Sequence, residues 1–444
     1  MKLQPLDRVA LTVSLILTIT IAILLGQGDQ TVPQVREFSW QNRQVNAADR
    51  MFLITFSRPM DQSSVESNLK ISPPIGGKFS WAGRRMAYTL TEPLPYGQKF
   101  SLSLTKATDR FAKSNVYLSF NNEFYTPDRG FVYIGTRGEE AGRLVLHNFS
   151  QNYHKILTPA DQLVTDFRIY PDRSYILYGA TGRGNNSSLL DQELFRVTTG
   201  IGNNPGEVEQ ILDNKEYQIF KFDLSGDGER IVVQRLSRSM RGSYGLWQIK
   251  NQQIAPLSQP PGGEFMIAPD NTSLAITQGE GVAILSLEEG TEPLDFLPKF
   301  GNILSFNQDG SQAVVVKFNK DYTRSLFLIN NQGQEQELIK IQGSLLASEF
   351  DFSGNLLYVL LTAVEQTNTT YQEHPYLAVI NLSDRHFSKL IDLKGQRDVT
   401  IDLAPDNQAI LLSSAESPIY QFTIGATNSL TALDWWGKKT TWLP

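Results

Sequence analysis

The chain of 444 residues contains no cysteine, and this absence excludes several kinds of chemistry at once. Without cysteine the chain forms no disulfide and has no thiolate nucleophile, Cys-ligated zinc site, iron–sulfur cluster or lipid-modified cysteine. Blocks of lysine and arginine are also missing, and the formal net charge at pH 7 is -6. Because nucleic-acid binding needs a concentrated basic surface, the composition argues against a nucleic-acid partner.

The usual catalytic motifs are missing as well. The serine-hydrolase elbow Gly-x-Ser-x-Gly does not occur. The four histidines form no His-x-x-x-His pair, and they are His147, His154, His374 and His386. The sequence therefore predicts no catalytic residue, no metal ligand and no cofactor.

One long uncharged run is present near the N-terminus, over residues 9–25. Lys2 and Arg8 precede this run, which is typical of an uncleaved signal anchor with its N-terminus in the cytoplasm. We therefore expect a cytoplasmic tail over 1–8, a transmembrane helix over 9–25 and a linker over 26–36. A cleaved signal peptide and a buried soluble helix are the alternatives.

Short strand patterns follow the linker without any helical periodicity. They are mostly aromatic, β-branched or alternating, and turn residues separate them. The segments are 37–40, 50–56, 77–81, 85–90 and 99–104. Five or more strands in about 90 residues predict a small β-sandwich over 37–127.

The stretch "LITFSRPMD" (53–61) begins as one of these strands and breaks at Pro59, which cannot donate to a ladder. We expect Met60 to turn inward as an apolar plug and Asp61 to cap the turn that follows. The motif resembles the bacterial Ig-like module of the S-layer (SbsA) type, as do "ISPP" (71–74) and "FYTP" (124–127). The resemblance covers about residues 33–127 and implies an Ig-like fold without chemistry of its own.

A repeat fills the chain beyond residue 128. Six segments share a strand, a turn with Asp or Asn, and a second apolar strand. The turn residues are Asp172, Asp227, Asp270, Asp309, Asn355 and Asp406. Their spacing is that of four-stranded propeller blades, and a truncated further copy precedes them. We expect an all-β protein with a propeller of about seven blades over 128–430, six or eight being the alternatives, and a tail over 431–444.

The repeats resemble the WD40-like propeller family of the TolB type, whose blades centre on a Ser-Pro-Asp-Gly turn. That resemblance implies a propeller that offers a face or channel to peptides and partner domains. The stretch "DLSGDG" (223–228) loosely resembles a calcium loop, but its twelfth position is Gln234 where a bidentate Glu is needed. We therefore interpret the recurring Asp residues as structural turns.

Two groups of residues are candidates for partner contact. Arg235, Arg238 and Arg241 make one loop locally basic, and the alternative is an ordinary solvated loop. Trp435, Trp436 and Trp442 lie in the C-terminal tail, where they suit partner or lipid contact or packing back onto the protein.

Together these patterns favour a binding protein over an enzyme. We expect a single-pass membrane protein, anchored in the bilayer through 9–25, with its folded part in the periplasm, at the cell exterior or in a thylakoid lumen. There it would act as a scaffold or assembly factor for an envelope or membrane complex, with protein partners at the propeller loops. The alternatives are a hydrolase with a dispersed site and a glycan or cell-wall binding protein using Trp81 or Trp247.

Overall fold

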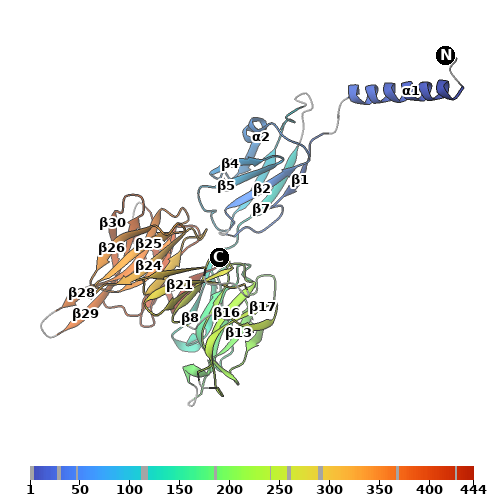
Figure 1. Cartoon of the computed structure of the whole chain (residues 1–444). Helices are drawn as coiled ribbons and strands as arrows, with labels where there is room; N and C mark the ends of the chain where they lie inside the picture. Colours follow the sequence, from blue (N-terminus) through green and yellow to red (C-terminus); the bar gives the residue numbers. More distant parts are fainter. Residues whose placement is uncertain are drawn as a thin grey trace. The chain divides into compact units, whose positions relative to one another are not determined.

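The computed structural model describes residues 5–27, 32–46, 49–111, 119–184, 188–240, 242–257, 262–288, 294–366, 370–425 and 428–444. The chain divides into two compact units. Residues up to 125 make up most of the first unit, and residues from 126 onward make up most of the second. Both units are built of antiparallel strands (Figure 1).

The predicted transmembrane helix over 9–25 is wrong. A helix, α1 (Pro5–Gln27), does form there, but within the described part of the chain no helix is long and apolar enough to cross a membrane. The uncharged run of 17 residues spans only about 25 Å as a helix, short of a hydrocarbon core of about 30 Å. Hydroxyl side chains also interrupt it, and those of Thr18 and Thr20 bond to carbonyls of their own helix.

The first unit contains two antiparallel sheets. One sheet has the order β1 (Val35–Phe38), β2 (Met51–Phe56), β5 (Arg85–Leu90), β4 (Gly77–Ala82). The other has the order β3 (Leu69–Ser72), β6 (Lys99–Leu104), β7 (Phe120–Tyr125). Alternate residues of β2 and β6 are buried, as expected for strands with one face toward a core. Rings from both sheets meet there, since Phe124 of β7 lies 6.4 Å from Phe38 of β1 and 5.0 Å from Phe100 of β6.

The break after β2 has the structure that the sequence predicts. The strand ends at Phe56, and Met60 is buried with 3% of its surface exposed. Asp61 is the N-cap of the short helix α2 (Gln62–Asn68), and its carboxylate accepts a hydrogen bond of 2.9 Å from the amide of Ser64. Pro59 thus lies just after the end of the strand, and the buried Met60 and the helix cap Asp61 follow it directly.

The second unit is a β-propeller, which confirms the architecture predicted from the repeats. Five four-stranded sheets form blades 2–6 in the described residues. Blade 2 has β11 (Gln162–Ile169), β12 (Tyr175–Gly182), β13 (Glu193–Thr198), β14 (Val208–Leu212). Blade 3 has β15 (Tyr217–Leu224), β16 (Arg230–Ser237), β17 (Tyr244–Lys250), β18 (Gln253–Pro256). Blade 4 has β19 (Phe265–Ile267), β20 (Ser273–Gln278), β21 (Gly281–Ser286), β22 (Asp295–Pro298). Blade 5 has β23 (Asn302–Phe306), β24 (Gln312–Phe318), β25 (Arg324–Asn330), β26 (Glu335–Ile341). Blade 6 has β27 (Leu345–Phe350), β28 (Leu356–Gln366), β29 (Tyr371–Asn381), β30 (Phe387–Asp392).

A single strand joins the last blade to the first. Blade 7 has β31 (Thr400–Leu403), β32 (Ala409–Ser413), β33 (Pro418–Thr423) and the first half of β34 (Ser429–Trp442). The second half of β34 pairs with β8 (Gly130–Gly135), which continues to β9 (Leu144–Asn148) and β10 (Tyr153–Ile156). The seven-stranded sheet thus makes two blades, blades 1 and 7. With blades 2–6, this gives seven blades in the described part of the propeller. Residues 431–444 lie in this strand and just after it, and they complete the copy that is truncated in the sequence.

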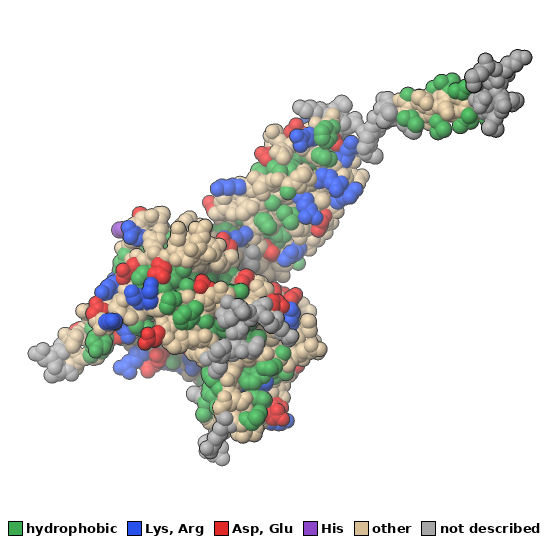
Figure 2. All heavy atoms as spheres, viewed as in Figure 1, with side chains coloured by type: hydrophobic (Ala, Val, Ile, Leu, Met, Phe, Trp, Pro, Cys, Tyr) green, Lys and Arg blue, Asp and Glu red, His purple; other side chains and the backbone are tan. Residues whose placement is uncertain are grey.

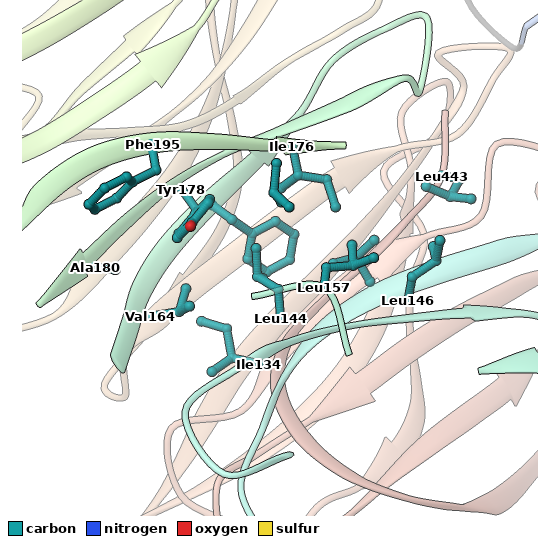
Figure 3. Packing of buried hydrophobic residues seen from close by; sticks show 13 residues of the cluster. Ile134, Leu144, Leu146, Leu157, Val164, Ile176, Tyr178, Ala180, Phe195 and Leu443 are labelled. Atoms are coloured by element: carbon teal, nitrogen blue, oxygen red, sulfur yellow. The ribbon is translucent and has the colours of Figure 1, made fainter. Parts of the chain in front are cut away.

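Apolar side chains fill the space between neighbouring blades. Figure 3 shows the cluster between blades 1 and 2, where Ile134 and Leu144 pack with Ile176 and Tyr178. Leu443, directly after β34, belongs to the same cluster. The residue that follows the closing strand therefore contributes to the core between blades 1 and 2.

The recurring Asp residues have a structural function in the blade turns. The carboxylate accepts a hydrogen bond from the amide two residues later at Asp172, Asp227, Asp270, Asp309 and Asp406. This is the geometry of an Asx turn, which these short polar side chains favour. The structure thus supports the turn interpretation of these residues.

Candidate functional site: the charged central channel

The innermost strands of several blades surround a cavity of about 720 Å³ at the centre of the propeller. Its lining comes from β11, β15, β27, β31 and β34, and from the residues before β13 and β19. The charged side chains of the lining are Asp166, Arg168, Lys221, Glu264, Asp402 and Lys439. Residues more than 270 positions apart in the sequence, such as Asp166 and Lys439, therefore meet here because the ring closes.

Ion pairs join the innermost strands of blades 1, 2 and 3. The guanidinium of Arg168 lies 2.8 Å from Asp223 and 3.3 Å from Asp166, and the ammonium of Lys439 lies 3.0 Å from Asp166. Burial alone would raise the pKa of Asp166, but Arg168 and Lys439 outweigh it, so this pKa is lowered. Burial likewise opposes the charge of Arg168, yet the two carboxylates raise its pKa. This wall of the channel is therefore charged, internally paired and fixed in position.

The network continues beyond these pairs. Asp223 accepts a hydrogen bond of 2.9 Å from the amide of Ile267 in blade 4, and Lys221 pairs with Glu264. Between blades 5 and 6, the hydroxyls of Ser305 and Ser348 lie 2.5 Å apart. Asp223, which the loose calcium motif would use as a ligand, is thus occupied by Arg168 and a backbone amide.

Two acids lie near each other on the innermost strands of blades 6 and 7, Glu349 on β27 and Asp402 on β31, and Asp402 lines the channel. Burial raises the pKa of Glu349 to about 7. Burial and then repulsion from Glu349 raise the pKa of Asp402 well above its ordinary value, against a lowering by the amide of Trp442. Glu349 pairs through its backbone with β28, and within the described residues its carboxyl makes no side-chain hydrogen bond or ion pair. Burial and mutual repulsion therefore favour the protonated form of these two carboxyls.

The structure describes two of the three arginines of the predicted basic loop, Arg235 and Arg238. Arg235 has 8% of its surface exposed, and its guanidinium lies 4.2 Å from the ring centre of Tyr217 and 4.5 Å from that of Trp247. Arg238 pairs with Asp191 at 2.8 Å. Arg241 lies outside the described residues. Arg235 thus packs within blade 3 and Arg238 links blade 3 to blade 2, and their assignment as partner contacts stays a prediction.

The three C-terminal tryptophans lie on the closing strand. Trp435 packs on His147 with ring centres 3.9 Å apart, and the guanidinium of Arg137 lies 3.0 Å from the ring centre of Trp436. Trp442 has 2% of its surface exposed. These contacts are the packing alternative that the sequence left open, and a partner role for these residues stays a prediction.

The sequence did not suggest that His147 and His154 would meet, but β9 and β10 place them opposite each other. Their ring centres lie 5.9 Å apart, next to Trp435, and His154 bonds to Glu140 at 2.6 Å. Burial and the neighbouring His154 lower the pKa of His147 to about 4. The sequence signal for this pair is the hairpin over 144–156, in which residues on facing strands lie opposite each other.

In the described ranges no group of three or more His, Asp and Glu side chains could hold a metal ion. The glycan alternative receives little support from the two tryptophans named for it. Trp81 stacks on Phe56 and donates to Glu66 at 2.8 Å, and Trp247 lies against Arg235. Both indoles are only partly exposed and are engaged within the fold.

Fold and channel together define a β-propeller protein with a charged, internally paired channel wall. No family model matches the sequence, and no curated protein matches it. Among solved structures the chain is similar to oligogalacturonate lyase from Vibrio parahaemolyticus, with 13% identity, a TM-score of 0.51, and coverage of 68% of this chain and 92% of that one. TolB from Acinetobacter baumannii gives 10% identity and a TM-score of 0.41, covering 90% of this chain and 86% of that one. At such a low identity, the similarity to the lyase shows only the propeller fold. The TM-score for TolB is too low to support any conclusion.

Proposed function

We propose that the propeller binds a segment of a partner protein in its central channel, and that the protein is a scaffold or assembly factor for an envelope or membrane complex. The observation that carries this proposal is the wall of paired charges across blades 1–4, because it presents fixed polar groups without reorganisation. Leu346 adds an apolar contact, since 44% of its surface is exposed in the channel lining. A few fixed polar groups beside an apolar contact are typical of binding sites.

The first unit would serve as a spacer of the SbsA-type Ig-like class. Its support is the order of the motifs between residues 33 and 127, together with antiparallel sheets of four and three strands. The same resemblance supports an extracytoplasmic location, which we retain as a proposal.

A photo-crosslinking residue tests the channel directly. Placed at Leu346 in the full chain and activated in the native cells, it should give one specific adduct with a partner protein. The matched control is the same residue at Val208, which is similarly exposed on the outer strand β14. Equal adducts from both positions, or none from Leu346, would contradict binding in the channel.

A hydrolase is the second candidate function, and the pair of Glu349 and Asp402 favours it. Two neighbouring carboxyls can divide the tasks of general acid and general base when their pKa values differ, as in glycoside hydrolysis, and here the pKa values of both are shifted by their environment. The test is turnover of a panel of aryl glycosides by the full chain and by Glu349→Gln. Turnover that the substitution abolishes supports this candidate, and the absence of turnover with every substrate counts against it.

A further inference from the structure

A second candidate surface lies at the junction of blades 4 and 5. Its lining shares no residue with that of the channel. Here a groove of about 970 Å³ is lined by the turn between β20 and β21, by β22 and the residues after it, and by the end of β24. Phe296 and Phe318 line the groove, with 50% and 59% of their surfaces exposed. Exposed phenylalanines that lie together on one surface are uncommon in a protein without a partner, because each leaves apolar area in water.

Two glycines hold these rings in place. A Cβ atom at Gly281 would lie 2.2 Å from the ring of Phe296, and one at Gly301 would lie 2.3 Å from the ring of Phe318. Each ring therefore lies directly on backbone that only glycine provides. Resting on backbone restricts the rings before anything binds, so less side-chain entropy is lost on association. The two phenylalanine rings are therefore already in position to provide the main apolar contacts with a partner.

The charges around the groove are mostly positive. Its lining contains Lys299, Lys317 and Lys320 against Glu280 alone, although the whole chain carries a net charge of -6. Lys299 lies 3.9 Å from Glu335, and the ammonium of Lys317 lies 5.7 Å from the ring centre of Phe327. Lys320 is exposed and makes no ion pair within the described residues. Figure 2 shows both acidic and basic side chains over the visible face, whereas the lining of this groove carries three lysines and one glutamate.

We propose that this groove docks an acidic peptide segment of a partner protein, whose apolar side chain packs on Phe296 and Phe318 while its carboxylates meet the lysines. Charge complementarity selects the acidic segment and steers its approach, and the two rings provide the apolar contact. The site is separate from the channel and does not depend on what the channel binds.

The test is fluorescence anisotropy with the full chain and a labelled peptide of the sequence Asp-Glu-Asp-Leu-Phe-Asp-Glu-Asp. We expect saturable binding at low salt that weakens as salt rises. The double variant Phe296→Ala, Phe318→Ala should weaken binding at least about tenfold, and Lys320→Glu should weaken it about threefold. The matched controls are Phe111→Ala and Lys78→Glu, which change exposed side chains of the first unit and should leave binding unchanged.

Three results would overturn the proposal. The first is the absence of binding by the acidic peptide, and the second is equal binding by a peptide with lysine in place of every acid. The third is tighter, groove-dependent binding to vesicles containing phosphatidylglycerol, which would assign the groove to a lipid surface. Unchanged melting temperatures of the groove variants, expected because these side chains are largely exposed, would show that the losses arise from the groove and not from unfolding.

Discussion

Trp442 makes two hydrogen bonds to Asp402. Its backbone amide donates to the carboxylate at 2.7 Å, and its indole Nε1 donates to the backbone carbonyl at 3.1 Å. Asp402 lies on the innermost strand of blade 7, whereas Trp442 lies on the innermost strand of blade 1. The two bonds therefore join the first and last blades at the channel, where the ring of a propeller would otherwise open.

A methyl group at Gly437 should weaken this closure. Its Cβ would lie 2.2 Å from the buried ring of Tyr133, so Gly437→Ala should destabilise the propeller by about 1–3 kcal/mol through overpacking. The matched control is Gly425→Ala, because a Cβ there meets no atom within 4 Å. Calorimetry of the propeller transition measures both, and equal melting temperatures would contradict the prediction.

Acid should destabilise the first blade through His147. In the folded protein its pKa is about 4, below the ordinary value. Its contribution to the free energy of unfolding is therefore complete above about pH 6.5 and is lost as the pH falls toward 4. The loss amounts to at most about 3 kcal/mol. His147→Phe should therefore flatten the decrease in melting temperature between pH 7 and pH 4.5, whereas His386→Phe, at an exposed position, should not. Parallel curves for the two variants would show that the buried imidazole is not responsible.

Raising the pH should destabilise the propeller through Glu349. Its folded pKa of about 7 exceeds its ordinary value, so its contribution is complete below about pH 4.5 and is lost as the pH rises through 7. Glu349→Gln removes the charge and should stabilise the propeller by about 1–3 kcal/mol at pH 8 while changing little at pH 5. Glu416→Gln, on an exposed turn, is the control. A variant that is no more stable than the parent at pH 8 would mean that the carboxyl is well solvated.

Loss of the cap on α2 should affect the first unit alone. Asp61→Ala removes the acceptor for the amide of Ser64 and should cost about 1 kcal/mol, whereas Gln62→Ala at the exposed next position should cost little. Separate thermal transitions of the two units provide the measurement. A shift of the propeller transition would contradict the assignment of Asp61 to a local cap.

The sequence by itself determined the features that depend on neighbouring residues. The strand break with Met60 and Asp61, the Asx turns and the blade repeat are local patterns of side-chain alternation and turn chemistry, and the structure contains all of them. The uncharged run over 9–25 is also a local pattern, but the membrane span that it predicts is wrong, because the run is short and carries several hydroxyl side chains.

Only the tertiary structure decided which distant residues meet. The double role of β34, the Asp166–Lys439 ion pair and the two acids at Glu349 and Asp402 all depend on strands of different blades that meet when the ring closes. A pKa or an exposed fraction is set by every atom nearby in space. No local pattern encodes that environment, because ring closure brings residues hundreds of positions apart to the same channel.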